Sequence, residues 1–150
     1  MLAATCFEFL TRCSLVSMTI GAPIGDEQAV YAVPLWLTLV VCGLLLGAGR
    51  RIDAILPAAN VASDPARHFE LDPATLIAAH RAARAGGPAV IGHYHSHPSG
   101  VAAPSPTDAA CAAPDGTLWL IVAGDVARLW IAGPGEGGAV RFAEAMLDIR

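Results

Sequence analysis

The segment "GHYHSHPSGVAAPSPTD", residues 92–108, concentrates side chains that can hold a metal ion. His93, His95 and His97 are spaced two residues apart, and side chains at this spacing point to the same face of an extended strand. Neighbouring imidazoles at the end of a strand can reach one ion. Pro98 lacks a backbone N–H and is expected to end the strand. The pattern therefore predicts a strand that ends in metal ligands.

A short helix is expected to follow this strand. Ser105 is predicted as its N-cap, with Pro106 at the first helical position and Asp108 in the first turn. The intervening loop, residues 98–104, is long enough to fold the Asp108 carboxylate back over the strand end. Two imidazoles, one carboxylate and a water form an open tetrahedral zinc site, which is the pattern of a catalytic metal.

Such a site would do hydrolytic chemistry. Zinc lowers the pKa of a bound water and polarises a carbonyl group, and the Ser105 hydroxyl is placed to bind the oxyanion of a tetrahedral intermediate. A Ser-x-x-Asp pattern alone is a common helix cap. The compound pattern His-x-His-Pro followed by Ser-x-x-Asp carries the prediction. His93 lies deeper in the strand, so we expect it to pack behind the ligands or to support them.

The elements that must position these residues alternate between strands and helices. Strands are expected at 38–47, 52–56, 67–71, 88–95, 117–124, 126–133 and 139–142, with a hairpin turn at Gly124-Asp125. One helix should open at Asp72-Pro73 and end at Gly86-Gly87, and a second should run from Ser105 to about Ala113. This order predicts a mixed α/β domain with helices packed on a mixed sheet.

The composition argues against several classes of protein, including nucleic-acid-binding and disulfide-rich proteins. The chain has 150 residues, 55% of them hydrophobic and 15% charged, with a net charge of −4. Scattered charges of this sign do not favour nucleic-acid binding or a polybasic membrane patch. Four dispersed cysteines do not make a disulfide framework. The first seventeen residues lack the pattern of a signal peptide, because charged residues interrupt them. We therefore expect a cytoplasmic protein.

An uncharged run at residues 28–49, "QAVYAVPLWLTLVVCGLLLGAG", allows two interpretations. Its length and hydropathy fit a transmembrane helix. Its second half, "TLVVCGLLLG", also fits a buried strand, because β-branched residues and an internal glycine are typical of one. A short helix or loop up to about Pro34 would then precede the strand.

The motif His95-Ser96-His97-Pro98 followed by Ser105-x-x-Asp108 resembles the JAMM motif of the MPN-domain (Mov34/PAD-1, JAB) zinc metallopeptidases. Three further stretches, "CGLLLG", "PAANVASDPARHFELDP" and "GHYHSHP", resemble their small prokaryotic branch. The resemblance implies a curved, single-layer mixed sheet flanked by helices, similar to the cytidine-deaminase fold. It implies one zinc ion held by His95, His97 and Asp108, with Ser105 stabilising the oxyanion. It also makes the apolar run a central strand and argues against a membrane span.

The same resemblance implies an activity and a class of partner. Members of the family hydrolyse peptide or isopeptide bonds, and small bacterial members resemble enzymes that process the tails of ubiquitin-like sulfur carriers. A ubiquitin-like protein or a peptide is therefore the expected substrate. The ligand spacing is also similar to that of the RadC-type family, which has been linked to DNA repair, but the acidic balance of the chain argues against DNA binding.

One position departs from the family pattern. The general base of the family is a glutamate two residues before the Cys-Gly pair, and this chain has Val40 there. Other acids, Asp26, Glu27, Asp64 and Glu70, do not fall where a base is needed, so the base is unassigned. The alternative to an enzyme is a zinc-binding module that binds a ubiquitin-like partner without catalysis.

The resemblance fades before Val40. We therefore expect residues 1–27 to be a poorly matched extension and residues 28–150 to form the JAB/MPN-like domain. A disturbed reading frame upstream of Val40 would explain the abrupt start of the match, and genomic sequence across codons 1–50 tests that explanation. The oligomeric state is not readable from the sequence.

Overall fold

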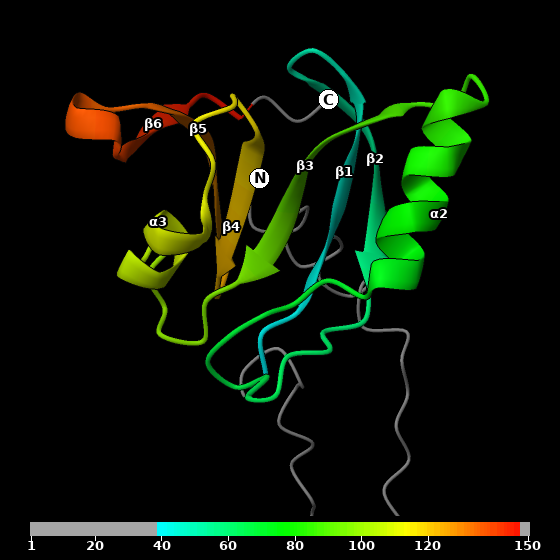
Figure 1. Ribbon diagram of the computed structural model, residues 1–150. Helices are drawn as coiled ribbons and strands as arrows, with labels where there is room; N and C mark the ends of the chain where they lie inside the picture. Colours follow the sequence, from blue (N-terminus) through cyan, green and yellow to red (C-terminus); the bar gives the residue numbers. More distant parts are fainter. Residues whose placement is uncertain (1–38, 148–150) are drawn as a thin grey trace, which may run out of the picture.

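The strands of this protein form a single six-stranded mixed sheet, seen in the computed structural model, which describes residues 39–147 (Figure 1). The strands are β1 (Cys42–Ala48), β2 (Arg51–Ala58), β3 (Ala89–Ser96), β4 (Leu118–Ala123), β5 (Val126–Pro134) and β6 (Val140–Ala145). They lie in the order β2-β1-β3-β4-β5-β6. The β3 and β4 strands are parallel and all other neighbours are antiparallel. The mixed α/β class is thus confirmed.

The helices lie beside this sheet. They are α2 (Pro73–Arg84), α3 (Pro106–Cys111) and the 3-10 helix η2 (Glu136–Gly138). The α2 helix contacts the sheet at β3, and Figure 1 draws α2 and α3 at opposite sides of the view. Asp72 caps α2 as expected, because its carboxylate accepts hydrogen bonds from the backbone N–H groups of Ala74 and Thr75. The hairpin between β4 and β5 also forms where the sequence predicts it.

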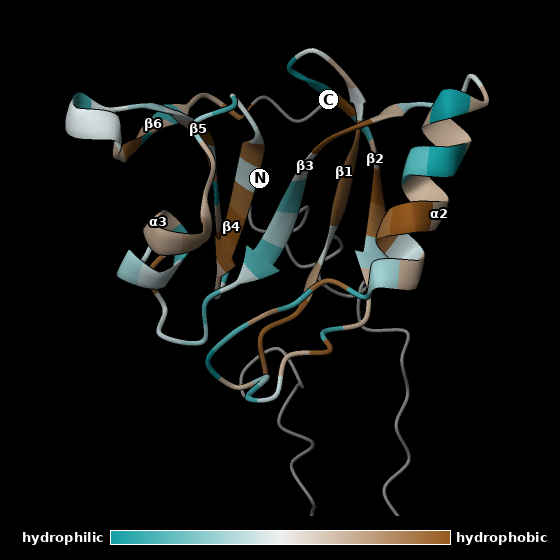
Figure 2. Ribbon diagram, in the orientation of Figure 1, coloured by the Kyte–Doolittle hydropathy of each residue, from teal (hydrophilic) through white to brown (hydrophobic). Residues whose placement is uncertain are grey.

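The second half of the apolar run forms β1, from Cys42 to Ala48. Leu44 and Leu45 are buried on this strand, and every residue of β4 is buried as well. Continuous apolar strands of this kind are typical of a sheet covered on both faces, and Figure 2 shows β1 and β4 as predominantly hydrophobic. No helix within residues 39–147 is long and apolar enough to span a membrane. The expectations for residues 1–27, and for a helix or loop up to Pro34, lie outside the described residues.

One expected strand is absent from its place. Residues 67–71 form a loop, and Leu71 makes only an isolated bridge with Asn60. The Asn60 side chain replaces the strand ladder: its amide group donates to the carbonyls of Val40 and His68, and its oxygen accepts from the N–H of Glu70. This asparagine ties the loop at 59–72 to the start of β1 and holds it near the end of β3.

Candidate metal centre

The end of β3, which carries His95 and His97, is held by hydrogen bonds to the chain segments on both sides. Ser96 points away from the ligand face, and its hydroxyl accepts a hydrogen bond from the N–H of Val41 at 2.9 Å. The N–H of His97 donates to the carbonyl of Val122 on β4 at 2.7 Å. Because both neighbouring chain segments anchor this end, the side chains of His95 and His97 leave the same face of the sheet from a rigid base.

The loop after β3 orients the second histidine. Gly100 has a φ of 80°, in the left-handed region that favours glycine, and its N–H donates to the carbonyl of His97. The turn brings the carbonyl of Val101 to 2.8 Å from Nδ1 of His97. A carbonyl only accepts, so Nδ1 carries the hydrogen and Nε2 faces the cluster. Ligating histidines are commonly held in this way.

The start of α3 supplies the carboxylate, as expected from the sequence. Ser105 is the N-cap and forms a capping box with Asp108, in which each side chain bonds the backbone N–H of the other residue. Asp108 is only 5% exposed. The helix is shorter than predicted and ends at Cys111, because Pro114 follows closely.

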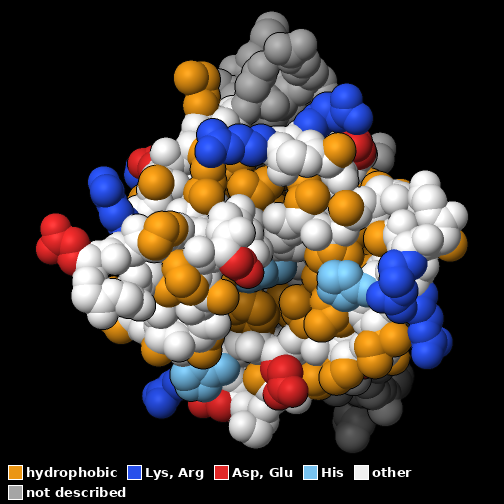
Figure 3. Space-filling model, turned by 45° about the horizontal axis from the view of Figure 1, so that its top comes forward, with side chains coloured by type: hydrophobic (Ala, Val, Ile, Leu, Met, Phe, Trp, Pro, Cys, Tyr) orange, Lys and Arg blue, Asp and Glu red, His pale blue; other side chains and the backbone are white. Residues whose placement is uncertain are grey.

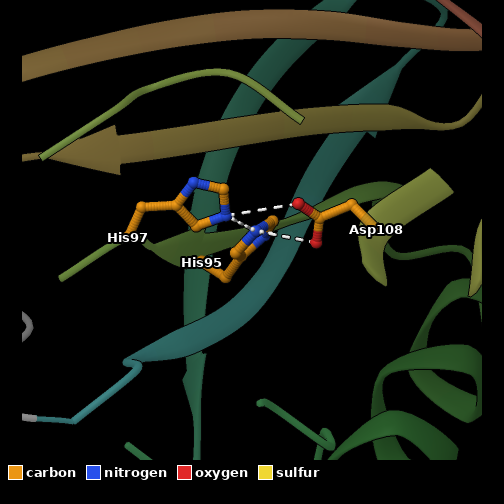
Figure 4. Close-up of side chains that lie close together, drawn as sticks. All are labelled: His95, His97 and Asp108. Carbon is orange, nitrogen blue, oxygen red and sulfur yellow. Dashed lines mark hydrogen bonds and ion pairs between the residues drawn. The ribbon is translucent and has the colours of Figure 1, made fainter. Parts of the chain in front are cut away.

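The three expected ligands converge (Figure 4). Nε2 of His95 lies 3.2 Å from Oδ1 of Asp108, and Nε2 of His97 lies 3.2 Å from Oδ2. The two Nε2 atoms are 2.9 Å apart. One donor atom from each residue therefore falls within 4.8 Å of the others. Two imidazole nitrogens and a carboxylate oxygen are a donor set that suits zinc and leaves a fourth position open. The residues present thus fit the ion.

Electrostatics favour a charged carboxylate among these rings. Burial opposes the charge of Asp108, but hydrogen bonds from His95 and His97 outweigh it and hold the carboxyl pKa well below its usual range. The hydrogen bond with Asp108 raises the pKa of His97. Burial lowers the pKa of His95, which favours the neutral imidazole that a metal needs.

Aromatic rings pack against His95, and its second ring nitrogen, Nδ1, makes no hydrogen bond. Its Nδ1 is buried and has no hydrogen-bond partner. The Phe69 ring stacks on it with the centroids 4.5 Å apart and the planes at 19°. Trp119 meets it edge-on at 6.0 Å. Sequence reasoning missed both residues, because Phe69 arrives from the loop at 59–72 and Trp119 from the neighbouring strand.

His93 lies on the same face, as its spacing predicts, but outside the cluster. Its ring packs against Phe69 and Trp119. Burial, with the neighbouring His95, lowers its pKa to about 4. Its Nε2 is buried and has no hydrogen-bond partner. The predicted packing role of His93 is compatible with these contacts.

A cavity of about 430 Å³ opens over the cluster. Figure 3 shows a hollow near the centre of the view, with histidine, acidic and hydrophobic side chains around it and arginines toward the edges of the face. Its lining comprises the loop residues Arg67, His68, Phe69 and Leu71, the three histidines of β3 and its end, Ser105, Thr107, Asp108 and Cys111 near α3, and Val40 and Trp119. The volume is within the range of small-molecule and peptide-tail pockets.

Val40 lines this cavity and occupies the position at which the family pattern would have a glutamate. It is 5% exposed, its N–H donates to the carbonyl of Pro65 at 2.7 Å, and its carbonyl accepts from Asn60. Asp108 is the single carboxylate that lines the cavity among residues 39–147. Asp64 and Glu70 are exposed and do not line it, and Asp26 and Glu27 lie outside the described residues.

The sequence of this chain is similar to those of known proteins. A family described as prokaryotic homologs of the JAB domain matches residues 41–134. Over 87 residues the chain is 38% identical to a protein of Haloferax volcanii named desampylase, which covers 57% of this chain and 63% of that protein. Over 67 residues it is 40% identical to a probable TtuB-protein conjugate cleaving protease of Thermus thermophilus, which covers 44% of this chain and 45% of that protein. The matches span less than two thirds of either curated relative.

Solved structures share the fold. A solution structure from Desulfitobacterium hafniense superposes with a TM-score of 0.59 at 27% identity and covers 77% of this chain and 83% of its own. A second solution structure, from Salinibacter ruber, gives a TM-score of 0.50 at 28% identity and covers 72% and 75% of the two chains. Both similarities extend over most of the described sheet and helices.

Proposed function

This chain belongs to the family of prokaryotic homologs of the JAB domain, and we propose that it is a zinc-dependent hydrolase of JAMM type that cleaves a peptide or isopeptide bond. The observation that carries the proposal is the convergence of His95, His97 and Asp108 in the wall of one cavity. One zinc ion per chain would bind there.

Each residue of the cluster has its own task in this proposal. A zinc ion bound there supplies a Lewis acid that polarises the scissile carbonyl and activates water. His97 is held by the carbonyl of Val101 and Asp108 by Ser105, so both ligands are oriented before substrate arrives. The Ser105 hydroxyl lines the same cavity and would donate a hydrogen bond to the developing oxyanion.

The proposed substrate is the tail of a ubiquitin-like protein. The names of the two curated relatives support this class, since one is a desampylase and the other is named for cleaving TtuB-protein conjugates. A cavity of about 430 Å³ has the size of a ligand pocket and is too small for a folded domain, which supports a tail as the bound part of the substrate. We propose no nucleic-acid partner, and the cytoplasmic location stays a prediction.

Val40 favours a second candidate function. Among residues 39–147, no carboxylate besides Asp108 lines the cavity to accept a proton from water, and general acid–base catalysis contributes about 10²–10⁴-fold. The chain would then be a zinc-binding module that holds a ubiquitin-like partner and hydrolyses its conjugates slowly or not at all. The intact cluster favours the enzyme, and the valine favours the module.

Zinc stoichiometry and hydrolysis together test both candidates. Native mass spectrometry should find one zinc per chain in the full-length protein and none in Asp108→Ala. Asp108→Asn is the matched control, because it keeps the side-chain size but removes the charge, and it should bind zinc weakly. Hydrolysis is then assayed on a ubiquitin-like protein fused through its tail to a reporter. Zinc without hydrolysis selects the binding module, and the absence of zinc overturns the metal centre.

A further inference from the structure

Three buried nitrogen atoms of residues that line the cavity have no hydrogen-bond partner. One is Nδ1 of His95, described above, and the other two are Nε1 of Trp119 and Nε2 of His93. Trp119 is 4% exposed, and both residues line the cavity that holds the metal cluster. An indole N–H can only donate a hydrogen bond. Buried polar groups nearly always have a partner, so a pair left unpartnered in one cavity needs an explanation.

Sheet register places the two rings side by side. His93 pairs with Trp119 across the parallel strands β3 and β4, so their side chains leave the same face. Their ring centroids are 4.1 Å apart, in an edge-on arrangement at 68°. An edge-on contact offers at most a weak N–H···π interaction, which does not replace an acceptor oxygen.

The neighbouring Trp130 differs from Trp119 because its indole N–H has a hydrogen-bond acceptor. Trp130 is opposite Trp119 on β5 and points to the same face. Its indole N–H donates to the carbonyl of Ala102 at 3.2 Å. The indole N–H of Trp130 therefore has an acceptor within the protein, and that of Trp119, in the cavity wall, does not.

We propose that Trp119, with His93 beside it, forms a subsite that binds a backbone carbonyl of the substrate tail. The inference rests on the proposed function and deepens it by adding a recognition contact next to the reacting bond. The ring of Trp119, which carries the donor, lies 6.0 Å from that of His95, measured between centroids. An extended peptide advances about 3.3 Å per residue. The carbonyl bound here therefore belongs about two residues from the scissile bond.

The surroundings define the chemistry of this ligand. Aromatic rings surround the two residues: Phe69 of the cavity wall is tilted against His93, and Phe142, behind the wall, is edge-on to Trp119 at 5.2 Å between centroids. A neutral N–H donor among such rings fits a neutral amide oxygen. Phe69 is half-buried and belongs to a loop, so its ring can turn aside to admit the tail, as side chains at binding surfaces commonly do. A water molecule has the same acceptor chemistry and is the competing occupant.

The test uses N-acetyl-triglycinamide, which presents backbone carbonyls and no side chains. It is titrated into the full-length ¹⁵N-labelled protein, with and without zinc, and the indole N–H resonances are followed by NMR. Loss of a resonance in Trp119→Phe and in Trp130→Phe assigns the two indoles. The Trp119 resonance should shift and saturate, while that of Trp130 stays in place. Probe affinity should fall about three- to tenfold in Trp119→Phe and less than twofold in Trp130→Phe.

The possible results separate this inference from the proposed function. A Trp119 resonance that does not move at saturating probe, or equal affinity in Trp119→Phe, overturns the subsite and leaves water as the occupant. Probe binding through Trp119 in a protein that hydrolyses no conjugate supports the subsite and counts against the enzyme. Hydrolysis with the same kcat/KM in wild type and Trp119→Phe supports the enzyme and overturns the subsite.

Discussion

Ser105 and Asp108 hold each other in both directions. Oδ2 of Asp108 accepts hydrogen bonds from the backbone N–H and from the hydroxyl of Ser105, each at 2.7 Å. The Ser105 oxygen in turn accepts from the backbone N–H of Asp108 at 3.2 Å. The hydroxyl proposed for oxyanion binding thus also orients Asp108, the proposed metal ligand. In that proposal it would turn from Asp108 to the substrate when the oxyanion forms.

Ser105→Ala should therefore lower both stability and hydrolysis. Loss of the cap costs about 1 kcal/mol of unfolding free energy, and loss of an oxyanion donor lowers kcat by about 10²-fold. Ser105→Thr keeps the hydroxyl and should retain most of both. Urea unfolding and kcat/KM on a conjugate measure the two effects. An alanine variant that is less stable but hydrolyses at the wild-type rate would show that Ser105 caps the helix and does not bind the oxyanion.

Stability of the zinc-free protein should fall in mild acid because of His93. Burial lowers the pKa of this residue to about 4, whereas an unfolded histidine titrates near 6.5. Between these values the unfolded chain binds a proton that the folded chain does not, so stability rises with pH across this window. The loss from pH 7 to pH 5 should be about 2 kcal/mol. Urea unfolding at both pH values measures it.

His93→Phe provides the control for this pH dependence. The variant keeps an aromatic ring at the position and removes the titrating group. Its unfolding free energy should depend less on pH between 7 and 5 than that of the wild type. An unchanged dependence would assign the acid sensitivity to other groups, such as His95, whose pKa is also lowered by burial.

The sequence predicted that His95, His97 and Asp108 converge because their geometry is local. The spacing of His95 and His97 on one strand and the capping pattern of Ser105 and Asp108 each fix a side chain within a few residues of its neighbours. Their convergence then needed only one short loop. The continuous apolar stretches that became β1 and β4 were likewise sufficient to indicate buried strands.

Contacts between distant segments were not readable from the sequence. The predicted strand at 67–71 was wrong, because the Asn60 side chain takes the hydrogen bonds that a strand ladder would make. That loop carries Phe69 onto His95, over a separation that periodicity does not address. The Trp119 indole belongs to a strand expected from its pattern, but its missing partner is visible only in three dimensions.

Phe69 should influence the affinity for zinc. Metal-bound histidines usually donate their second ring N–H to an acceptor, and changes to such supporting groups cost about 10–100-fold in metal affinity. His95 has the Phe69 ring in place of that acceptor. Phe69→Ala should weaken zinc binding within this range, and Phe69→Tyr, which keeps the ring, should not. Competition with a chromophoric chelator measures both variants. Equal zinc affinity in Phe69→Ala would show that β3 alone orients His95.

Val40→Glu tests whether the missing carboxylate limits catalysis. The backbone of Val40 is fixed by hydrogen bonds to Pro65 and Asn60, and its side chain lines the cavity of the metal cluster. A glutamate there would place a general base beside the reacting water, which should raise kcat by about 10²–10⁴-fold. Val40→Gln is the matched control, because it has the same length and cannot accept the proton, so it should give no gain. Zinc stoichiometry is measured in both variants to exclude loss of the ion. A zinc-loaded Val40→Glu protein that hydrolyses no faster than wild type would favour the binding module over the enzyme.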